Sequence, residues 1–421
     1  MNIYLLYWKH KYRAVEYFAK VLASALRDNG CRTSTIGIQE PQAAAEVARM
    51  ISDRDADLVI ALTPDALGFK ARGKTLMELM PCRFAILFMD SPIYLARQMA
   101  RLVRKLPDDT LMLFPDARQA QQARDHFDES HSGRFITHFF PLGSIPPVPR
   151  AASTDEPAFD LVLLMNIDDQ ISAEFVRHDQ WTGEFPAITP GVPTGAQAKI
   201  AGLARQLVPG HYDLDLVDLL SQETGLRQPL GVNADNALAT TFDSYVKRYR
   251  RVAAGKALIE SAYTRSLRVA VGGTGWDRIG EIPRAWVRLD EVTYKGQLPI
   301  FGKSKAVFNL APNWTASIHD RVLNAAACGA IAVTNQNRYT SLVLQHGVDY
   351  VKYASAADLP GALEDALPRW QSISDKATTR LAMASQWRDR CKDIINHLTH
   401  GKGRAALQRT ADQGPPHRRG A

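Results

Sequence analysis

The chain has 421 residues, of which 46% are hydrophobic and 23% are charged. This ordinary globular composition excludes intrinsic disorder, collagen and coiled coil for the bulk of the chain, and the length predicts two to three domains at roughly 150 residues each. The formal net charge is +7, but residues 400–421 hold five basic side chains against one acidic side chain, a net +4, so the body carries only about +3. We expect a poorly ordered basic tail over 400–421 that contacts at most a membrane surface, and no nucleic-acid binding by the nearly neutral body.

The cysteines and the N-terminal residues indicate in which cellular compartment the protein resides. The four cysteines are scattered without a CxxC pair, which argues against a disulfide framework or a cysteine zinc site and fits a reducing compartment. The opening residues MNIYLLYWKH are too short and too rich in tyrosine for a signal peptide, and no apolar run approaches the roughly 18 residues of a membrane span. We therefore expect a cytoplasmic protein.

The first 150 residues alternate short apolar runs with stretches of helical spacing. Continuous apolar strands separated by helices predict a parallel sheet covered on both faces, which is a Rossmann-like domain. The expected strands are residues 3–8, 31–38, 57–63, 84–89 and 110–114, and the expected helices are 12–29, 41–53 and 117–127.

A proline-rich joint with Pro146, Pro147 and Pro149 follows and shows no periodic apolar pattern, so we place a domain boundary near residue 155. The second half contains another α/β unit. The expected domains are 1–155 and 156–399, with a helical insertion over about 168–262. The expected strands of the second domain are 159–165, 267–271, a short one within 287–294, 306–310, 330–334 and 348–353, and the expected helices are 320–328, 356–370 and 374–398.

A glycine-rich turn follows the 267–271 strand. The dinucleotide fingerprint needs the spacing G-x-G-x-x-G, and counting from Gly273 through Gly275 places Arg278 where the third glycine should be. This argues against NAD, and we expect no cofactor. Two interpretations remain open, a structural tight turn and a loop that lines a ligand site at the end of the strand.

The segment 317–335 combines a loop, a short helix of small residues, a glycine stop and a strand. The N-terminus of such a helix presents free N–H groups and a positive dipole end, which bind phosphate. Asp320 is a plausible N-cap, and His319 and Arg321 add donors that fit a diphosphate. Asn324, one turn after Arg321, could bond a sugar or ribose hydroxyl. The plain alternative is a capped helix with a surface arginine and a loop histidine.

These residues resemble the donor-binding motif of GT-B fold glycosyltransferases, more specifically of the CgeB-like, spore-maturation group. The resemblance is best over about 267–367 and patchy over 84–145, where Met89-Asp90-Ser91-Pro92 is similar to an Asp-x-Pro segment of that group. The pieces that match in the second half are Lys303-Ser304-Lys305, Asn309-Leu310, Ile318-His319-Asp320-Arg321, Asn324 to Gly329, and Thr334.

The resemblance implies a bacterial enzyme with two Rossmann-like domains that face each other across a cleft. It implies that the second domain binds a nucleotide-sugar donor and that the first presents an acceptor of unknown identity. The expected donor contacts are Gly273, Gly275, Lys305, Asp320, Arg321, Asn324 and Thr334, with His319 close to the chemistry.

The chain departs from the wider group 1 glycosyltransferase pattern, which has two glutamates eight residues apart. The matching positions are Ala316 and Asn324, and neither can supply a carboxylate. The roles of those glutamates are therefore in doubt here, and His319 or Arg321 would take over contact with the donor.

Acceptor activation needs a group that takes a proton from the attacking hydroxyl. Asp90 stands at the end of an apolar strand, where ligands of parallel sheets bind, and we expect it to be this base. Its plain alternative is an aspartate that caps a turn. Asp116 and His10 follow other strands of the same domain and are weaker candidates.

No convincing metal motif is present, since there is no HExxH spacing and Asp213-Leu-Asp215 reads as the solvated face of an amphipathic helix. A basic stretch around Arg250 likewise reads as a solvated helix face. We therefore expect a metal-independent glycosyltransferase. The alternatives are a nucleotide-sugar epimerase of GT-B shape and a GT-B-like binding protein without catalysis.

Overall fold

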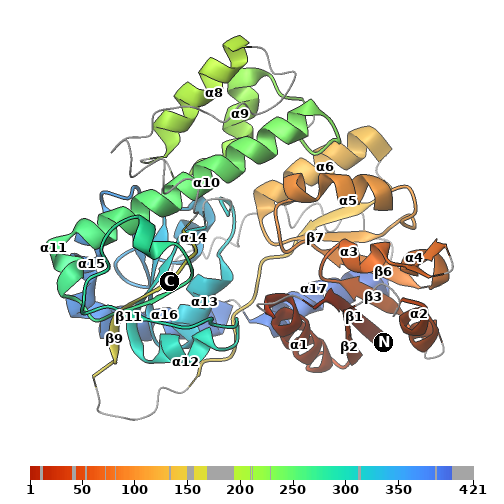
Figure 1. Cartoon of the computed structure of the whole chain (residues 1–421). Coiled ribbons are helices and arrows are strands. Elements are labelled where there is room, and N and C mark those ends of the chain that lie inside the picture. The colour runs from red at the N-terminus through yellow and green to blue at the C-terminus, as the bar shows by residue number, and fades with distance from the viewer. Residues whose placement is uncertain are drawn as a thin grey trace, which may run out of the picture. The chain divides into compact units, whose positions relative to one another are not determined.

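The structure is a computed structural model that describes residues 1–9, 13–39, 44–52, 55–71, 73–80, 82–131, 134–148, 156–167, 194–208, 210, 212–227, 229–311, 314–384 and 386–400 (Figure 1). Contacts divide the chain into two units. One comprises Met1–Gly143, Leu230–Val232 and Ser385–Ala421, and the other comprises Ser144–Pro229 and Asn233–Ala384. The expected α/β fold with two Rossmann-like units is confirmed, but this division falls between Gly143 and Ser144 rather than near residue 155.

The first unit is built on a six-stranded parallel sheet in the order β2-β1-β3-β6-β7-β8. The central strands β3 and β7 are buried along their whole length, as expected for a parallel sheet covered on both faces. The strands are β1 (Asn2–Trp8), β2 (Arg32–Ile38), β3 (Leu58–Ala61), β6 (Arg83–Leu87), β7 (Leu111–Phe114) and β8 (Ile136–Phe139), with a small antiparallel pair β4 (Lys70–Ala71) and β5 (Lys74–Thr75). The helices are α1 (Ala14–Arg27), α2 (Ala44–Ser52), α3 (Asp65–Gly68), α4 (Leu76–Leu79), α5 (Pro92–Leu102) and α6 (Ala117–His131).

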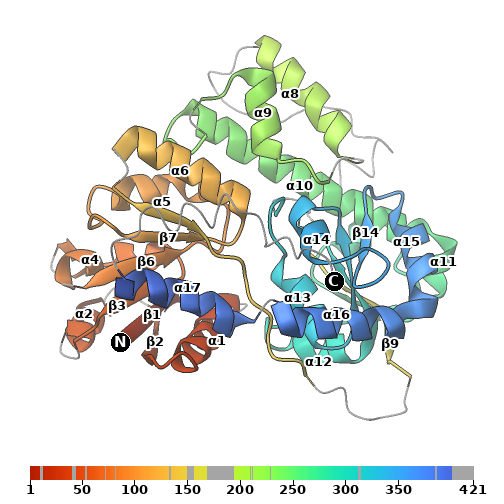
Figure 2. The same cartoon turned by 180° about the vertical axis from the view of Figure 1, so that it is seen from behind.

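The last helix, α17 (Trp387–His400), packs on α1 in the first unit (Figure 2). The Trp387 ring contacts the rings of Phe18 and Phe140, each at a centroid distance of 6.1 Å. Gly143 lies so close that an added Cβ would come within 2.5 Å of the Trp387 backbone nitrogen. The expected single helix over 374–398 is therefore wrong, because α16 (Trp370–Ala384) ends in the second unit and α17 begins in the first.

The second unit holds another six-stranded parallel sheet, in the order β11-β10-β9-β12-β13-β14. Its strands are β9 (Phe159–Leu164), β10 (Val269–Gly272), β11 (Val287–Arg288), β12 (Ser304–Asn309), β13 (Ile331–Asn335) and β14 (Val351–Tyr353). Its other helices are α8 (Thr194–Leu207), α9 (Leu216–Thr224), α10 (Ala234–Glu260), α11 (Ala262–Ser266), α12 (Gln297–Gly302), α13 (Asp320–Ala327), α14 (Arg338–Val343) and α15 (Leu359–Ala366), with short 3-10 turns η2 (Trp276–Arg278) and η3 (Leu367–Arg369).

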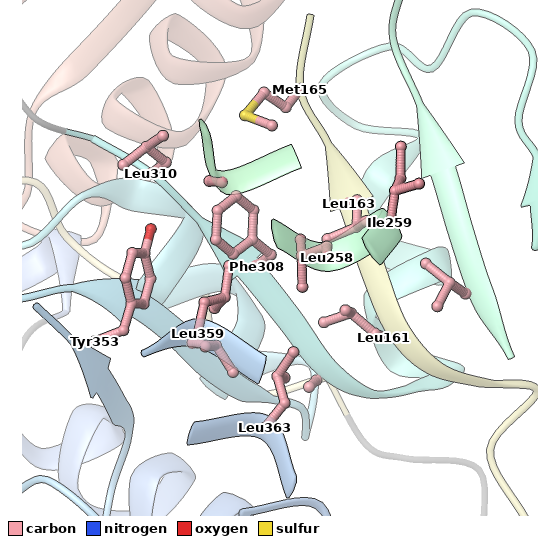
Figure 3. Close-up of a cluster of buried hydrophobic side chains, with 14 of the residues drawn as sticks. Leu161, Leu163, Met165, Leu258, Ile259, Phe308, Leu310, Tyr353, Leu359 and Leu363 are labelled. Atoms are coloured by element: carbon pink, nitrogen blue, oxygen red, sulfur yellow. The ribbon is translucent and has the colours of Figure 1, made fainter. Parts of the chain in front are cut away.

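The core of the second unit lies between this sheet and the helices α10 and α15 (Figure 3). Leu258 and Ile259 of α10 and Leu363 of α15 pack against Leu161 of β9 and Phe308 of β12, and all five are at most 2% exposed. Burial of this apolar area fixes the sheet, and with it the positions of the loops that leave its carboxyl edge.

The helical insertion contains α8, α9 and α10, and two expectations about it are wrong. Arg250 is fully buried rather than solvated, since its Nε donates to the Leu207 carbonyl oxygen at 2.9 Å and its guanidinium lies 4.6 Å from the Tyr212 ring centroid. Burial lowers the pKa of Arg250 to about 10. Asp215 is not on a helix face, because it is the N-cap of α9 and accepts the backbone N–H groups of Val217 and Asp218.

The expected basic tail lies outside the described residues from position 401 onward. Among the helices of the described part of the chain, none has the length and hydropathy required to cross a bilayer.

Candidate functional site

The carboxyl ends of the parallel strands in the second unit meet at one edge of the sheet, where ligands of such sheets bind. The N-terminus of α13 lies in the connection that leaves β12 at this edge. Around it the structure collects a group that we call the α13 site, which consists of His319, Asp320, Arg321 and Asn324 with Asn309 and Tyr294. Tyr294 was not expected from the sequence.

His319, and not Asp320, is the N-cap of α13. Its Nδ1 accepts the Arg321 backbone N–H at 3.2 Å, and the same Nδ1 lies 3.0 Å from Asp320 Oδ1. When Nδ1 carries no proton it accepts the Arg321 backbone N–H, and when it carries one it donates to the Asp320 carboxylate. The two contacts therefore require different positions of the ring proton. The ring also packs edge-on against Trp314 at a centroid distance of 5.2 Å.

Asp320 is the first residue of α13, and its side chain is only 11% exposed. The Tyr294 hydroxyl donates a hydrogen bond to its Oδ2. Burial by itself would raise the pKa of Asp320, but His319, the Tyr294 hydroxyl and the charge of Arg321 together lower it to about 2. A negative charge is therefore held at the first turn of the helix, where the dipole favours it.

Arg321 carries the least satisfied charge of the α13 site. Its Nη1 makes a long hydrogen bond of 3.5 Å to Asn309 Oδ1, and its buried Nε has no partner among the described residues. Burial lowers the pKa of Arg321, and the charge of the nearby Asp320 opposes this shift. A buried guanidinium in this condition is unfavourable by itself and favours an anion beside it.

Thr334 and Asn324 support the site from buried positions. Thr334 is 4% exposed, and its hydroxyl accepts a hydrogen bond from Asn309 Nδ2 at 2.9 Å. This bond fixes the orientation of the Asn309 side-chain amide. Asn324 is 3% exposed, and its Nδ2 donates to the Tyr294 hydroxyl at 2.8 Å. The structure thus joins Asn324 to Asp320 through Tyr294.

Gly273 and Gly275 lie at the same sheet edge, and their glycine identity has a structural reason. Both have positive φ angles, +104° and +82°. An added Cβ would come within 2.3 Å of the Met165 carbonyl oxygen at Gly273 and of the Ile167 carbonyl oxygen at Gly275. The turn therefore needs these glycines to pass the chain that leaves β9, which agrees with the tight-turn interpretation.

Lys305 is a correction to the expected site. It is the second residue of β12, at the amino end of the strand, whereas Asn309 is at the carboxyl end about 13 Å further along. Its Nζ pairs with Glu156 and Asp160, each at 2.9 Å, and Arg268 joins the same network. Lys305 thus closes an ion-pair network at the opposite edge of the sheet and does not belong to the α13 site.

The acceptor-side candidates lie in the first unit. Asp90 is exposed and follows β6, just before Ser91, the N-cap of α5. Asp116 is 1% exposed and accepts the backbone N–H groups of Arg118 and Gln119, which makes it a structural cap of α6. His10 lies outside the described residues.

A metal site and a surface pocket are the two remaining kinds of candidate site. No three histidine, cysteine, aspartate or glutamate side chains within those residues gather closely enough to hold a metal ion. A surface pocket of about 470 Å³ lies between η2 and β11, lined among others by Glu281, Arg284 and Trp286.

Comparison with known proteins shows what the chain is similar to. Residues 250–396 match the family described as glycosyl transferase-like, and this range contains the whole α13 site. No curated protein matches the chain. The match covers 250–396 only, so it shows a similarity of that part of the chain, most of which lies in the second unit, to that family.

Several solved glycosyltransferases are similar to the chain in structure. Sucrose-phosphate synthase from Thermosynechococcus elongatus is 9% identical with a TM-score of 0.52, over 94% of this chain and 98% of that chain. AviGT4, a glycosyltransferase of avilamycin A biosynthesis, is 12% identical with a TM-score of 0.47, over 94% and 96%. Anabaena HepE in complex with UDP-glucose is 10% identical with a TM-score of 0.48, over 94% and 99%. The two parallel six-stranded sheets with flanking helices are those of the GT-B fold.

Proposed function

We propose that the chain, whose fold and family match are those of glycosyltransferases, moves a hexosyl group from a nucleotide-sugar donor to an acceptor without a metal ion. The donor diphosphate binds at the α13 site of the second unit. The acceptor, a glycan, a protein or a small molecule, binds to the first unit. We propose further that the chain is of the CgeB-like type, whose motif these residues resemble.

The condition of Arg321 is the observation that carries this proposal. Its Nε is buried without a partner among the described residues, and its side-chain bond to Asn309 is long at 3.5 Å. The N-terminus of α13 is next to it, with His319 as the cap. A diphosphate supplies the acceptor oxygens that this guanidinium lacks, and Arg binds phosphate in a bidentate manner.

The chemistry needs stabilisation of the negative charge that builds on the departing diphosphate. The Arg321 guanidinium provides donors for that charge, the positive dipole end of α13 favours it, and protonated His319 adds another donor. In the proposal these groups replace the metal ion that other transferases use. Asp90 takes the proton from the acceptor hydroxyl as it attacks the anomeric carbon.

The absence of the two group 1 glutamates does not leave this region without a carboxylate. Ala316 and Asn324 occupy the glutamate positions, but Asp320 is linked to Asn324 by the Tyr294 hydroxyl. This link favours a working donor site over a binding protein that has lost its catalytic groups.

A thermal-shift panel of nucleoside diphosphates and nucleotide sugars tests the proposal, followed by turnover assays with the donor that stabilises most. Protection by a nucleotide, and its loss in Arg321→Met, is the expected result. An epimerase would instead consume the nucleotide sugar with no acceptor present. A binding protein would be protected by the ligand and would turn over none of the acceptors tried.

The location is part of the proposal. All four cysteines are free, and three of them are buried, so we place the protein in a reducing, cytoplasmic compartment. Contact of the basic 400–421 segment with an anionic membrane surface is proposed on its charge alone.

A further inference from the structure

The hydroxyl of Tyr294 is bonded on two sides inside the α13 site. It donates to the Asp320 carboxylate and accepts from Asn324 Nδ2 at 2.8 Å. Asp320 and Asn324 are both buried and both come from α13, whereas Tyr294 is half-buried and comes from the loop 289–296 between β11 and α12. A side chain from outside α13 thus forms hydrogen bonds with two polar side chains of the helix, which lie four residues apart on its first turns.

This pair of hydrogen bonds is the pair that an alcohol makes. A ribose or hexose hydroxyl donates one proton to a carboxylate and accepts one from an amide, as the phenol does here. Because a buried carboxylate and a buried amide both need partners, the position must be filled when the ligand is absent. The Tyr294 hydroxyl fills it.

Backbone hydrogen bonds hold both ends of the loop that carries Tyr294. Leu289 N–H donates to the Val271 carbonyl oxygen at 2.8 Å, and Gln297 N–H donates to the Thr293 carbonyl oxygen at 3.1 Å. Between them Asp290, Glu291 and Thr293 are exposed. Loop segments that bury little surface open at low free-energy cost, so release of the Tyr294 hydroxyl need not disturb the sheet.

We propose that Tyr294 is a specificity-determining gate, whose hydroxyl holds the place of a ligand hydroxyl between Asp320 and Asn324 and is replaced by it on binding. The inference rests on the proposed function, because the ligand is a nucleotide sugar. It makes the α13 site selective for ligands that carry a hydroxyl as well as a diphosphate.

The variant Tyr294→Phe tests the gate by titration calorimetry with UDP, UDP-glucose and inorganic pyrophosphate. The variant leaves Asp320 and Asn324 open, so the two nucleotides should bind about fivefold more tightly, as expected when a ligand no longer displaces roughly one net hydrogen bond. Pyrophosphate has no hydroxyl, and its affinity should change less than twofold. Tyr263→Phe, at a half-buried tyrosine of α11, is the matched control and should leave all three affinities unchanged.

Other outcomes separate the gate from the proposed function. Equal weakening of all three ligands would show that Tyr294 only supports the site, and weaker binding of the nucleotides alone would show that it bonds the ligand directly; either result overturns the gate. If neither pyrophosphate nor any nucleotide bound the natural protein, the proposed function would fail, and the gate with it.

Hydrogen exchange of the natural protein gives a second measurement that does not depend on the folding of a variant. Saturation with nucleotide should speed exchange of the backbone amides at 289–298, because the bond that fastens the loop to α13 is lost. Unchanged or slower exchange there would contradict the gate.

Discussion

Replacement of Arg321 by methionine should separate binding from stability. Arg321 lies on α13, and among the described residues its buried Nε has no partner and its Nη1 makes a long hydrogen bond of 3.5 Å, so the folded protein gains little from its charge. Removal of a poorly paired buried cation in favour of an apolar side chain of similar length is often neutral or stabilising. Each charge-assisted hydrogen bond to a phosphate is worth about 1.5–3 kcal/mol, so the variant should bind a nucleoside diphosphate roughly 10- to 150-fold more weakly.

Two measurements on the same sample check this separation, the melting temperature without ligand and the shift of that temperature with a nucleoside diphosphate. Arg321→Met should keep or raise the first and lose most of the second. Arg268→Met is the matched control, since Arg268 pairs with Glu156 and Asp160 in the ion-pair network at the amino ends of β9 and β12. A large drop in the unliganded melting temperature of Arg321→Met, with its nucleotide shift preserved, would refute the reasoning.

Three further changes have defined outcomes. The pKa of Asp320 is lowered to about 2 in the folded state, so its charge stabilises the fold by about 2 kcal/mol. This stabilisation is present above the unfolded pKa near 4 and is lost as the pH falls towards 2. Asp320→Asn should flatten that part of the curve of unfolding free energy against pH. Lys305→Met should change nucleotide affinity less than twofold relative to the natural protein and should lower the unfolding free energy by about 1 kcal/mol. A large loss of affinity would show that Lys305 does contact the ligand. Gly275→Ala should lower the free energy of unfolding, measured with denaturant, by about 2 kcal/mol or more. Gly361→Ala, in open space on α15, is the control and should be neutral or slightly stabilising. Equal effects of the two variants would contradict the close approach of Gly275 to Ile167.

Much of the fold could be predicted from the sequence, because buried parallel strands are continuous apolar runs. All six strands of the second sheet and five of the six strands of the first were expected. The strand that was missed, β8 (Ile136–Phe139), lies at the sheet edge and has only His138 buried among its four residues, so it lacks such a run. The break between α16 and α17 was missed because helical spacing continues through it, whereas the packing of Trp387 against Gly143 is a long-range contact.

The candidate site was predicted in part, and strand direction explains the error at Lys305. His319, Asp320, Arg321 and Asn324 are close in sequence, so one helix turn brings them together. Lys305 is close in sequence to Asn309, but strand direction carries the two to opposite edges of the sheet, where Lys305 meets Glu156 and Asp160. A basic residue near a motif predicts a ligand contact only after its position along the strand is known.

Tyr294 shows the opposite limit of the sequence. It stands in an irregular loop, 26 residues before Asp320 and 30 before Asn324, and no spacing rule relates a loop tyrosine to a helix that starts after another strand. The physical requirement that joins them is local, since Asp320 and Asn324 are buried polar groups that need partners. That requirement could have been stated from the sequence once α13 was expected to be buried, but the side chain that meets it comes from the fold of the 289–296 loop. A search for the partners of buried polar groups therefore finds functional residues that motif spacing does not.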